Sequence, residues 1–502
     1  MGRVLDHKLV RNTLLLTVFA FVSRGVGLLF QSLVSRSLGA AGLGEFQLLL
    51  SIHGLAATLA VSGVRFAVTR LAAEALGRGK QTELRSVLLP GIGYALFFSL
   101  LALGLVWPLA PFLARTWAGG EEGALPLRLL ALGLPFLALS AVMGGFFTAA
   151  GKVGRAALLQ LLEQLALVAF TLLLLPEAEG PGAGELALSF ASAAASCLGF
   201  LVTLPVFLAL LRGFGKQNRR AGGLRRLLEI ALPLALSSYA RTALGTLRHV
   251  LIPGGLRRAG ASAEEALAVY GTVHGMVFPV LLFPSALLTS LAELLVPELT
   301  ELQVRGRTRE LELRAARILG LCYRFAVGCA ALLGCFGTEL GALLYDSAQA
   351  GQFICLLSPL VVVMYMDTVT DGMLKGLGQQ LHSMAINVAD AALSLALVVW
   401  LLPLWAVRGY LFILFFSECF NFALSLRRLG KLVRLRAGAA ELLLPPLLAL
   451  GAASAARLLG RLLPGTAGLF LALAAAGCCY AALLWLTEEG HVRPAGAMKT
   501  GT

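Results

Sequence analysis

The stretch TLLLTVFAFVSRGVGLLFQSLVSR, residues 13–36, contains two arginines and no other charged side chain. A helix of this length is about 36 Å long, which is enough to cross the ~30 Å hydrocarbon core of a bilayer. The stretch is too long for the apolar region of a cleavable signal, and no small-residue cleavage site follows it before the next apolar segment. We therefore expect a retained first transmembrane helix.

The rest of the chain has the same character. Of its 502 residues, 58% are hydrophobic and 14% are charged, and the mean hydropathy is +0.84. Soluble domains carry about 25% charged residues. These values exclude a soluble globular enzyme, a disordered chain and a secreted disulfide scaffold. The eight cysteines contain no CxxC pair, so we interpret them as apolar side chains in a reduced setting.

Fourteen apolar segments are long enough to span a membrane as helices. With the N-terminus inside, 28 of the 41 lysines and arginines fall on cytoplasmic loops and tails, and only 5 fall on the opposite side. This bias predicts an even number of spans and places both termini in the cytoplasm. The segments are 13–36, 46–69, 87–113, 125–149, 156–176, 185–211, 227–252, 266–296, 316–337, 353–374, 383–404, 407–426, 441–460 and 466–487.

An internal repeat relates the two halves of the chain. One constant shift along the sequence pairs four residues with residues of matching type, and a separate Ser/Thr-x-His-Gly match runs at a slightly smaller shift. The matches follow one another in order, which predicts two six-helix lobes related by a parallel pseudo-twofold axis. The pairs are Gly145 with Gly372, Gly151 with Gly378, Gln160 with Asn387, Glu163 with Asp390, and, at the smaller shift, residues 51–54 with residues 272–275.

The sequence therefore predicts an all-α polytopic membrane protein with four parts. No loop is long enough to hold a folded soluble domain, and the basic loops are explained by topology and by contact with lipid headgroups. The parts are an N-terminal lobe of helices 1–6 (1–211), a cytoplasmic linker (212–223), a C-terminal lobe of helices 7–12 (224–430), and two extra helices with a short cytoplasmic tail (431–502).

Motifs for catalysis are absent from the sequence. The nearest approach to a phosphate-binding loop ends at Lys152 and has Val153 where a Ser or Thr would hold Mg²⁺. The six histidines are scattered, so no metal-ligand cluster is expected. A glycosyltransferase that uses lipid-linked sugars would need acidic residues in an outer loop, and the first such loop carries only Glu45. We expect neither enzymatic activity nor a cofactor.

Arginines inside the predicted spans are the most informative residues. A charge at the bilayer centre costs about 2.5–3.5 kcal/mol on insertion scales, so it is retained mainly for function or for pairing. Arg24 lies midway along the first helix and Arg241 midway along the seventh, which are equivalent helices of the repeat. Arg248 follows Arg241 by two turns on roughly the same face, and Arg65 lies in the inner part of the second helix.

These four arginines predict a cationic cavity that binds the substrate. Guanidinium groups bind phosphate bidentately and stay charged at any physiological pH. The alternative is a structural role, in which the arginines form ion pairs with carboxylates of the spans. The available carboxylates are Glu163, Glu293, Asp390 and Glu418.

Six further titratable residues are candidates for coupling to a cation or a proton. Each also has a structural interpretation. A histidine in a span can pack through hydrogen bonds, an aspartate four residues before a lysine forms an ion pair, and a carboxylate near a helix start complements the helix dipole. Both interpretations stay open for each residue. The six are His53, His274, Asp367, Asp371, Glu163 and Asp390.

Several N-terminal stretches resemble the multidrug/oligosaccharidyl-lipid/polysaccharide (MOP) exporter superfamily, which shares the arrangement of six, six and two helices. Within it, the chain is similar to the branch of polysaccharide-biosynthesis flippases around stage V sporulation protein B. The resemblance covers nearly the whole chain and is strongest in the part up to Ala75. It rests on residues 12–14 (NTL), 23–27 (SRGVG), 38–44 (LGAAGLG) and 63–74 (GVRFAVTRLAAE).

The resemblance implies a V-shaped bundle of two lobes that works by alternating access in the bacterial cytoplasmic membrane. The implied substrate is an undecaprenyl-pyrophosphate-linked glycan, plausibly lipid II, moved from the inner to the outer leaflet for peptidoglycan or polysaccharide of the cell wall or spore cortex. Related lipid II flippases carry a Ser-Arg pair that Ser23-Arg24 matches. They also carry an Arg-Asp pair where this chain has Phe30 and Gln31.

Two other functions compete with this interpretation. One is a cation-coupled multidrug exporter of the same superfamily, which would need a buried carboxylate in the cavity of the N-terminal lobe. The other is a membrane scaffold for cell-wall synthesis that transports nothing. The expected partners are the lipid-linked anionic glycan and membrane lipids, with a coupling cation or proton and cell-wall synthesis proteins as further candidates. The basic charge is explained by topology, so no nucleic acid is expected.

Overall fold

The structure of the chain, a computed structural model, describes residues 2–77, 84–117, 120–178, 180, 182–212, 223–435, 438–460 and 465–492. Every regular element within these residues is a helix, so the predicted all-α fold is confirmed. An all-helical chain is expected here, because a helix satisfies its own backbone hydrogen bonds in hydrocarbon. Most of the predicted linker 212–223, the tail from 493 and Arg461 lie outside the described residues.

The helices confirm a multi-pass membrane protein. Ten are long and apolar enough to cross a membrane, or eleven when the bent pair α13 (Ala348–Leu357) and α14 (Leu360–Gly376) forms one span. All fourteen predicted segments fall on helical stretches: α1 (Gly2–Val61) contains the first and most of the second, and α15 (Gln380–Gly430) contains two. The number fourteen itself stays a prediction.

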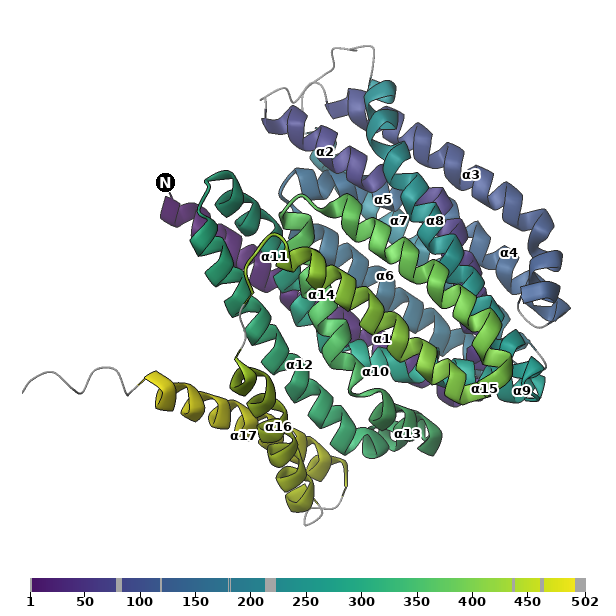
Figure 1. Ribbon diagram of the computed structural model, residues 1–502. Helices are drawn as coiled ribbons and strands as arrows, with labels where there is room; N and C mark the ends of the chain where they lie inside the picture. The colour runs from purple at the N-terminus through teal and green to yellow at the C-terminus, as the bar shows by residue number, and fades with distance from the viewer. Residues whose placement is uncertain are drawn as a thin grey trace, which may run out of the picture. The chain divides into compact units, whose positions relative to one another are not determined.

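By their contacts, the helices divide into two compact units. Unit 1 comprises Met1–Gly275 and Asn387–Leu414. It contains α1, the middle of α15, and the short 3-10 turns Glu121–Gly123 and Leu175–Glu177 (Figure 1). Its other helices are α2 (Val64–Gly77), α3 (Leu84–Trp117), α4 (Ala124–Leu132), α5 (Leu134–Ala149), α6 (Val153–Leu174), α7 (Ala183–Arg212), α8 (Gly223–Arg258) and α9 (Ala263–Gly271).

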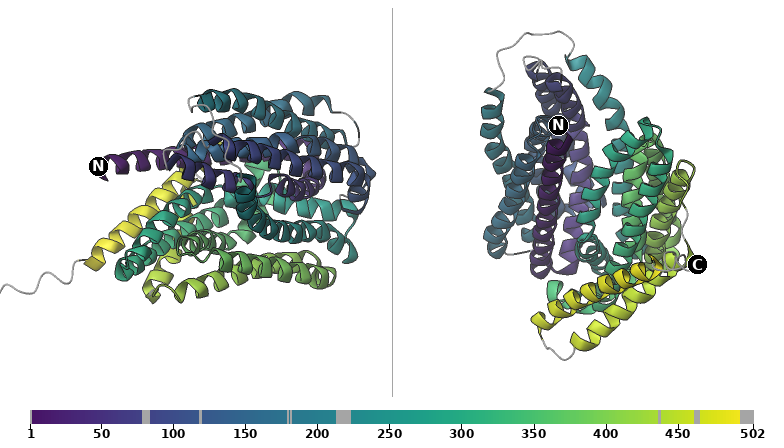
Figure 2. Two further views of the ribbon diagram at one scale, coloured as in Figure 1. Left: turned by 90° about the horizontal axis from the view of Figure 1, so that it is seen from above. Right: turned by 90° about the vertical axis from the view of Figure 1, so that its left-hand side faces the viewer.

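Unit 2 comprises Met276–Ile386 and Phe415–Thr502, and a π-helix, Thr272–Val277, spans the boundary between the units. Within unit 2, α16 and α17 lie side by side (Figures 1 and 2). The predicted lobes 1–211 and 224–430 divide the chain at other points and stay a prediction. Besides α13, α14 and the ends of α15, the helices of this unit are α10 (Phe278–Leu282), α11 (Ser285–Val304), α12 (Thr308–Tyr345), α16 (Ala439–Gly460) and α17 (Thr466–Val492).

Helix α1 reverses direction at a single residue. Its 60 residues would form a rod of about 90 Å, three times the thickness of the hydrocarbon core. Gly39 interrupts the helix with φ 72° and ψ −178°, a conformation that costs side-chain-bearing residues too much to be common. The predicted span 13–36 lies on the arm before this break, and the predicted span 46–69 begins on the arm after it and continues into α2.

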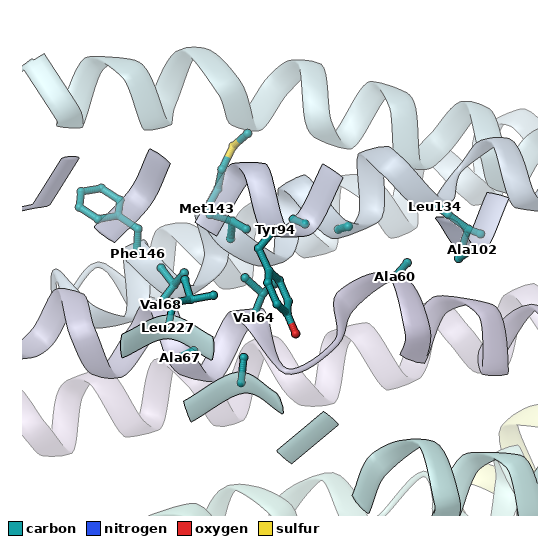
Figure 3. Packing of buried hydrophobic residues seen from close by; sticks show 14 of the residues in the cluster. Ala60, Val64, Ala67, Val68, Tyr94, Ala102, Leu134, Met143, Phe146 and Leu227 are labelled. Atoms are coloured by element: carbon teal, nitrogen blue, oxygen red, sulfur yellow. The ribbon is translucent and has the colours of Figure 1, made fainter. Parts of the chain in front are cut away.

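A second break separates α1 from α2 in the middle of the second predicted span. Ser62 and Gly63 both have positive φ, at 47° and 73°. The Tyr94 hydroxyl donates to the Ser62 carbonyl oxygen at 3.0 Å, and the Tyr239 hydroxyl hydrogen-bonds to Ser62 Oγ. Figure 3 shows the Tyr94 hydroxyl directed at the chain between Ala60 and Val64. Two tyrosines from other helices thus hold the backbone just before Arg65.

Apolar side chains surround this break. Val64, Val68, Met143, Phe146 and Leu227 are each at most 2% exposed and belong to one cluster that joins α1–α5 and α8 (Figure 3). The cluster fixes α2 against α5, and so fixes the helix that carries Arg65.

The repeat is visible as identical local geometry. After α5, Gly151 has φ 68°, and the Lys152 amide donates to the Phe147 carbonyl at 2.8 Å. After α14, at the equivalent position of the repeat, Gly378 has φ 73°, and the Gln379 amide donates to the Leu374 carbonyl at 2.8 Å. Both helices therefore end in the same left-handed glycine turn, which supports the pairing of these two glycines in the sequence.

Candidate functional site

Two of the predicted site residues, Arg65 and Glu163, line one cavity of about 240 Å³ in unit 1. We call it the Arg65 cavity. Its walls come from α1, α2, α5, α6 and α7, and they carry the polar groups of Ser140, Gln160 and Thr203 beside apolar side chains. A cationic and an anionic side chain thus face the same space inside a membrane-spanning bundle.

Glycines of α5 make room for Arg65. A Cβ at Gly145 would lie 2.7 Å from the Arg65 carbonyl oxygen, so only glycine allows α2 and α5 to approach so closely. One residue earlier, a Cβ at Gly144 would lie 3.9 Å from Arg65 Nε. Thr69 Oγ1 donates to the Gly145 carbonyl oxygen at 3.2 Å and ties the two helices together one turn further along α2.

A second cavity of about 360 Å³ also lies in unit 1, and we call it the histidine cavity. One face of α8 lines it, because Thr242, Gly245, Thr246 and His249 recur at spacings of three and four residues. Helix α1, helix α9 and the π-helix complete the walls. Their contributions are Gln47, Leu50, Ser51, Tyr270 and His274.

Aromatic and imidazole rings pack closely at one wall of this cavity. The rings of His249 and His274 lie 4.7 Å apart, centroid to centroid, and Tyr270 lies 4.7 Å from His274. The Tyr270 hydroxyl is 3.2 Å from His249 Nδ1, a hydrogen bond in which either group can donate. Tyr410 of α15 packs beyond His274 at 6.2 Å. These four side chains form what we call the histidine cluster.

Two predicted arginines of α8 are next in sequence to residues that line the histidine cavity. Arg241 precedes the lining residue Thr242, and Arg248 precedes the lining residue His249. Arg248 Nη1 donates to Ser394 Oγ of α15 at 3.4 Å, while Arg241 is exposed. Within the described part of the chain, neither Arg65 nor Arg241 forms an ion pair. The alternative, in which the arginines form structural ion pairs with carboxylates of the spans, therefore gains no support at Arg65 and Arg241.

Arg24 lies on the first arm of α1 and lines neither of these two cavities. It is half-buried and interacts with neighbouring residues. Helix α6 packs against this arm, since Gln164 Nε2 donates to the Ser23 carbonyl at 2.8 Å. Gln164 follows Glu163, so α6 connects the neighbourhood of Arg24 with the Arg65 cavity.

The remaining carboxylate candidates lie elsewhere. Asp367 and Asp371 are on α14 in unit 2. Lys375 Nζ lies 2.6 Å from Asp371 Oδ2, and Ser383 Oγ also donates to Asp371. Asp390 is on α15 in unit 1, and its carbonyl accepts from Ser394 Oγ at 2.8 Å. An ion pair and a hydrogen bond thus account for Asp371.

The histidines divide into a cluster and a single residue. His53 Nδ1 is buried and has no hydrogen-bond partner among the described residues. His249, which contacts His274, is absent from the sequence-based candidates. A signal for it was available, because His249 follows an arginine of the seventh predicted span and lies two turns beyond Thr242 on one helix face. Within the described ranges, no group of three or more His, Cys, Asp or Glu side chains could hold a metal ion.

Multiple apolar spans around cavities lined by polar side chains are the architecture of a helical membrane transporter. The comparison with known families then becomes specific. A profile described as "Polysaccharide biosynthesis protein" matches residues 9–303, which is more than half of the chain. The chain therefore belongs to the polysaccharide biosynthesis protein family.

Two relatives from Bacillus subtilis (strain 168) match most of the chain. Stage V sporulation protein B is 26% identical over 403 residues, covering 78% of this chain and 75% of that protein. Lipid II flippase MurJ is 23% identical over 448 residues, covering 81% of this chain and 79% of that protein.

Solved structures share the fold. MurJ in an inward closed conformation superposes with a TM-score of 0.68 at 12% identity, covering 96% of this chain and 100% of that one. An inward-facing multidrug resistance MATE family transporter of the MOP superfamily superposes with a TM-score of 0.63 at 14% identity, covering 82% of this chain and 98% of that one. Together these comparisons confirm the predicted membership of the MOP superfamily.

Proposed function

We propose that the chain is a flippase that moves an undecaprenyl-pyrophosphate-linked glycan, with lipid II as the specific candidate, from the inner to the outer leaflet of the bacterial cytoplasmic membrane. Both termini are then cytoplasmic. The single observation that carries this proposal is the set of arginines on helices of unit 1, of which Arg65 lines one polar cavity and Arg241 and Arg248 are next in sequence to residues that line the other. The relatives support it, because one is named as a lipid II flippase and one as a sporulation protein.

The chemistry of the substrate fits these arginines. A pyrophosphate diester carries two negative charges and cannot cross the hydrocarbon core unaided. Arg65, Arg241 and Arg248 provide fixed positive charges and donors that replace its hydration shell. Serine, threonine and glutamine side chains of both cavities supply neutral hydrogen-bonding groups that suit sugar hydroxyls. The lipid tail stays in the bilayer, so only the headgroup needs a polar path.

Transport by this route requires the substrate site to open to the two sides in turn. The chain changes direction at two helix breaks, at Gly39 and at Ser62-Gly63, and the second follows Val61, which lines the Arg65 cavity. The driving force comes from the membrane potential, from an ion gradient, or from consumption of the flipped glycan outside. Sporulation-specific or general cell-wall synthesis proteins are the partners that would use the product.

The test is flipping of fluorescent lipid II in proteoliposomes. Wild type is compared with Arg24→Ala, Arg65→Ala and Arg241→Ala, and with Arg225→Ala as the control. Arg225 is also an α8 arginine, but it is 86% exposed and pairs with Glu229 outside the cavities. We expect flipping by wild type and control and at least a tenfold lower rate in each of the three other variants. Unchanged flipping in all three variants would show that the arginines do not bind the substrate.

A cation-coupled drug exporter is the second candidate, and one observation favours it. Glu163 lies in the Arg65 cavity and in the predicted N-terminal lobe, where such an exporter needs a carboxylate. A fluorescent lipophilic cation in the same proteoliposomes distinguishes the two functions. Uptake of the dye that is lost in Glu163→Gln, with no lipid II flipping by folded wild type, would replace the flippase proposal. Neither activity in folded protein would point to the scaffold role.

A further inference from the structure

We propose that His249 and His274 form a proton-binding site whose protonation is linked to the binding of a pyrophosphate anion in the histidine cavity. The inference rests on the proposed function, because the anion is the pyrophosphate group of the substrate. The inference adds a proton as a second ligand beside the anion, and it assigns the proton to His249 and His274.

Geometry places both imidazoles at the anion's position. Each ring lines the histidine cavity, and the rings are 4.7 Å apart in a T-shaped arrangement. They come from different elements, α8 and the π-helix. π-helices are rare, occur mostly as single turns inside α-helices, and are frequent at functional sites. Here it brings His274 to the cavity one turn after Tyr270.

Charged and titratable groups face the pair from every element packed against it. Helix α8 contributes a cation next to the pair, α9 and α15 contribute phenols, and α1 contributes neutral polar groups. The residues are Arg248 on α8, Tyr270 on α9, Tyr410 on α15, and Gln47 and Ser51 on α1. None of these five residues carries a carboxylate, so an anion bound in the cavity would place a negative charge beside the pair.

Electrostatics then couples the two ligands. Two imidazolium rings at 4.7 Å, beside a guanidinium group and partly buried in the protein, repel each other, so the pair holds at most one proton. An anion in the cavity removes this penalty and raises the affinity for the proton. By thermodynamic reciprocity, the protonated pair binds the anion more tightly than the neutral pair. The hydrogen bond between the Tyr270 hydroxyl and His249 Nδ1 stabilises the protonated pair.

The quantity to measure is the number of protons taken up when the anion binds. Calorimetry of the full chain in detergent, in two buffers that differ in ionisation enthalpy, gives this number directly. The probes are lipid II and, as a soluble source of the same group, UDP-N-acetylglucosamine. Both are pyrophosphate diesters whose own charge is constant between about pH 5.5 and pH 8, so any uptake belongs to the protein. Binding of lipid II alone would show that the lipid tail is required.

The variants are His249→Gln, His274→Gln and Tyr270→Phe, with His382→Gln as the control. His382 is an exposed histidine at the start of α15 in unit 2. We expect wild type and control to take up as much as one proton when the probe binds. Above the pH at which the pair titrates, their affinity for the probe should fall by up to about tenfold per pH unit. The two histidine variants bind with little pH dependence and no uptake, and Tyr270→Phe keeps the uptake at a shifted pH.

The possible results separate the two proposals. Binding by wild type without proton uptake overturns this inference and leaves the flippase proposal intact. Proton uptake that persists in both histidine variants also overturns it, because another group then takes the proton. Absence of any binding by folded wild type removes the flippase proposal, and the inference falls with it. Native elution from a size-exclusion column establishes that each variant is folded.

Discussion

Gly44 of α1 and Gly271 of α9 each lie against the backbone of the other's helix. A Cβ at Gly44 would overlap the carbonyl oxygen of Leu267, and a Cβ at Gly271 would overlap the carbonyl oxygen of Ala40. The shift that pairs the two halves of the repeat also takes Gly44 to Gly271 and Ala40 to Leu267. The two contacts are therefore the same contact seen from either copy of the repeat. Reciprocal contacts of this kind are what a pseudo-twofold axis produces.

This crossing should not tolerate a methyl group. We expect Gly44→Ala and Gly271→Ala to lower the stability of the chain by about 1–3 kcal/mol each, because the backbones must separate. Thermal unfolding in detergent measures the change. Gly54→Ala is the matched control, since it lies on the same helix with nothing within 4 Å of the added Cβ. An equal effect of the control would show that helix propensity, rather than close packing, determines the result.

The helix break at Ser62-Gly63 should depend on the hydroxyl group of Tyr94. Tyr94→Phe removes a buried hydrogen bond to the Ser62 carbonyl, and we expect a loss of about 0.5–1.5 kcal/mol. Tyr345→Phe serves as the control, because the Tyr345 hydroxyl is buried and has no hydrogen-bond partner among the described residues. That variant should be neutral or slightly stabilising. Equal melting temperatures for wild type and Tyr94→Phe would contradict the proposed role of the hydroxyl.

Equivalent turns of the repeat should respond equally to the same substitution. Gly151 and Gly378 have φ of 68° and 73°, with open space around each Cβ position. Alanine at either position therefore costs only backbone strain, about 1 kcal/mol. Differential scanning fluorimetry of the two variants should give the same shift within error. Unequal shifts would mean that the two turns, although alike in geometry, support their surroundings differently.

Helix α8 should cross from the cytoplasm to the outside. Ala261→Cys, after the end of α8, should react with a membrane-impermeant maleimide added to intact cells, whereas Arg309→Cys should react only after lysis. The exposed native cysteines Cys419, Cys478 and Cys479 are first changed to serine. The reverse labelling pattern would invert the proposed topology and place both termini outside.

Local features of the structure can be predicted from the sequence. The apolar runs fall on helices because their length and composition leave no other conformation in hydrocarbon. The pairing of Gly151 with Gly378 is visible because only glycine suits a left-handed turn. The match of residues 51–54 with residues 272–275 is less reliable. The Gly44–Gly271 contact favours the larger shift at this point too, which pairs His53 with Val280 rather than with His274.

Features that depend on how helices pack cannot be predicted in this way. Nothing in residues 272–277 indicates a π-helix, and the histidine cavity exists only because α1, α8 and α9 meet around it. His249 is missed for this reason, since its importance lies in its contact with His274. Arg65 and Glu163 are identified separately, but their shared cavity follows from the close approach of α5 to α2 at Gly145.

The reversal of α1 at Gly39 also limits what a protease or an antibody can recognise at this turn. Helical residues continue on both sides of that one glycine, so the first two spans are joined with almost no intervening loop. Proteases and antibodies need several residues of extended, accessible chain, and the tip of this hairpin offers none. An epitope tag inserted there would have to unwind both arms, whereas the connection between α8 and α9 offers non-helical residues that could accept one.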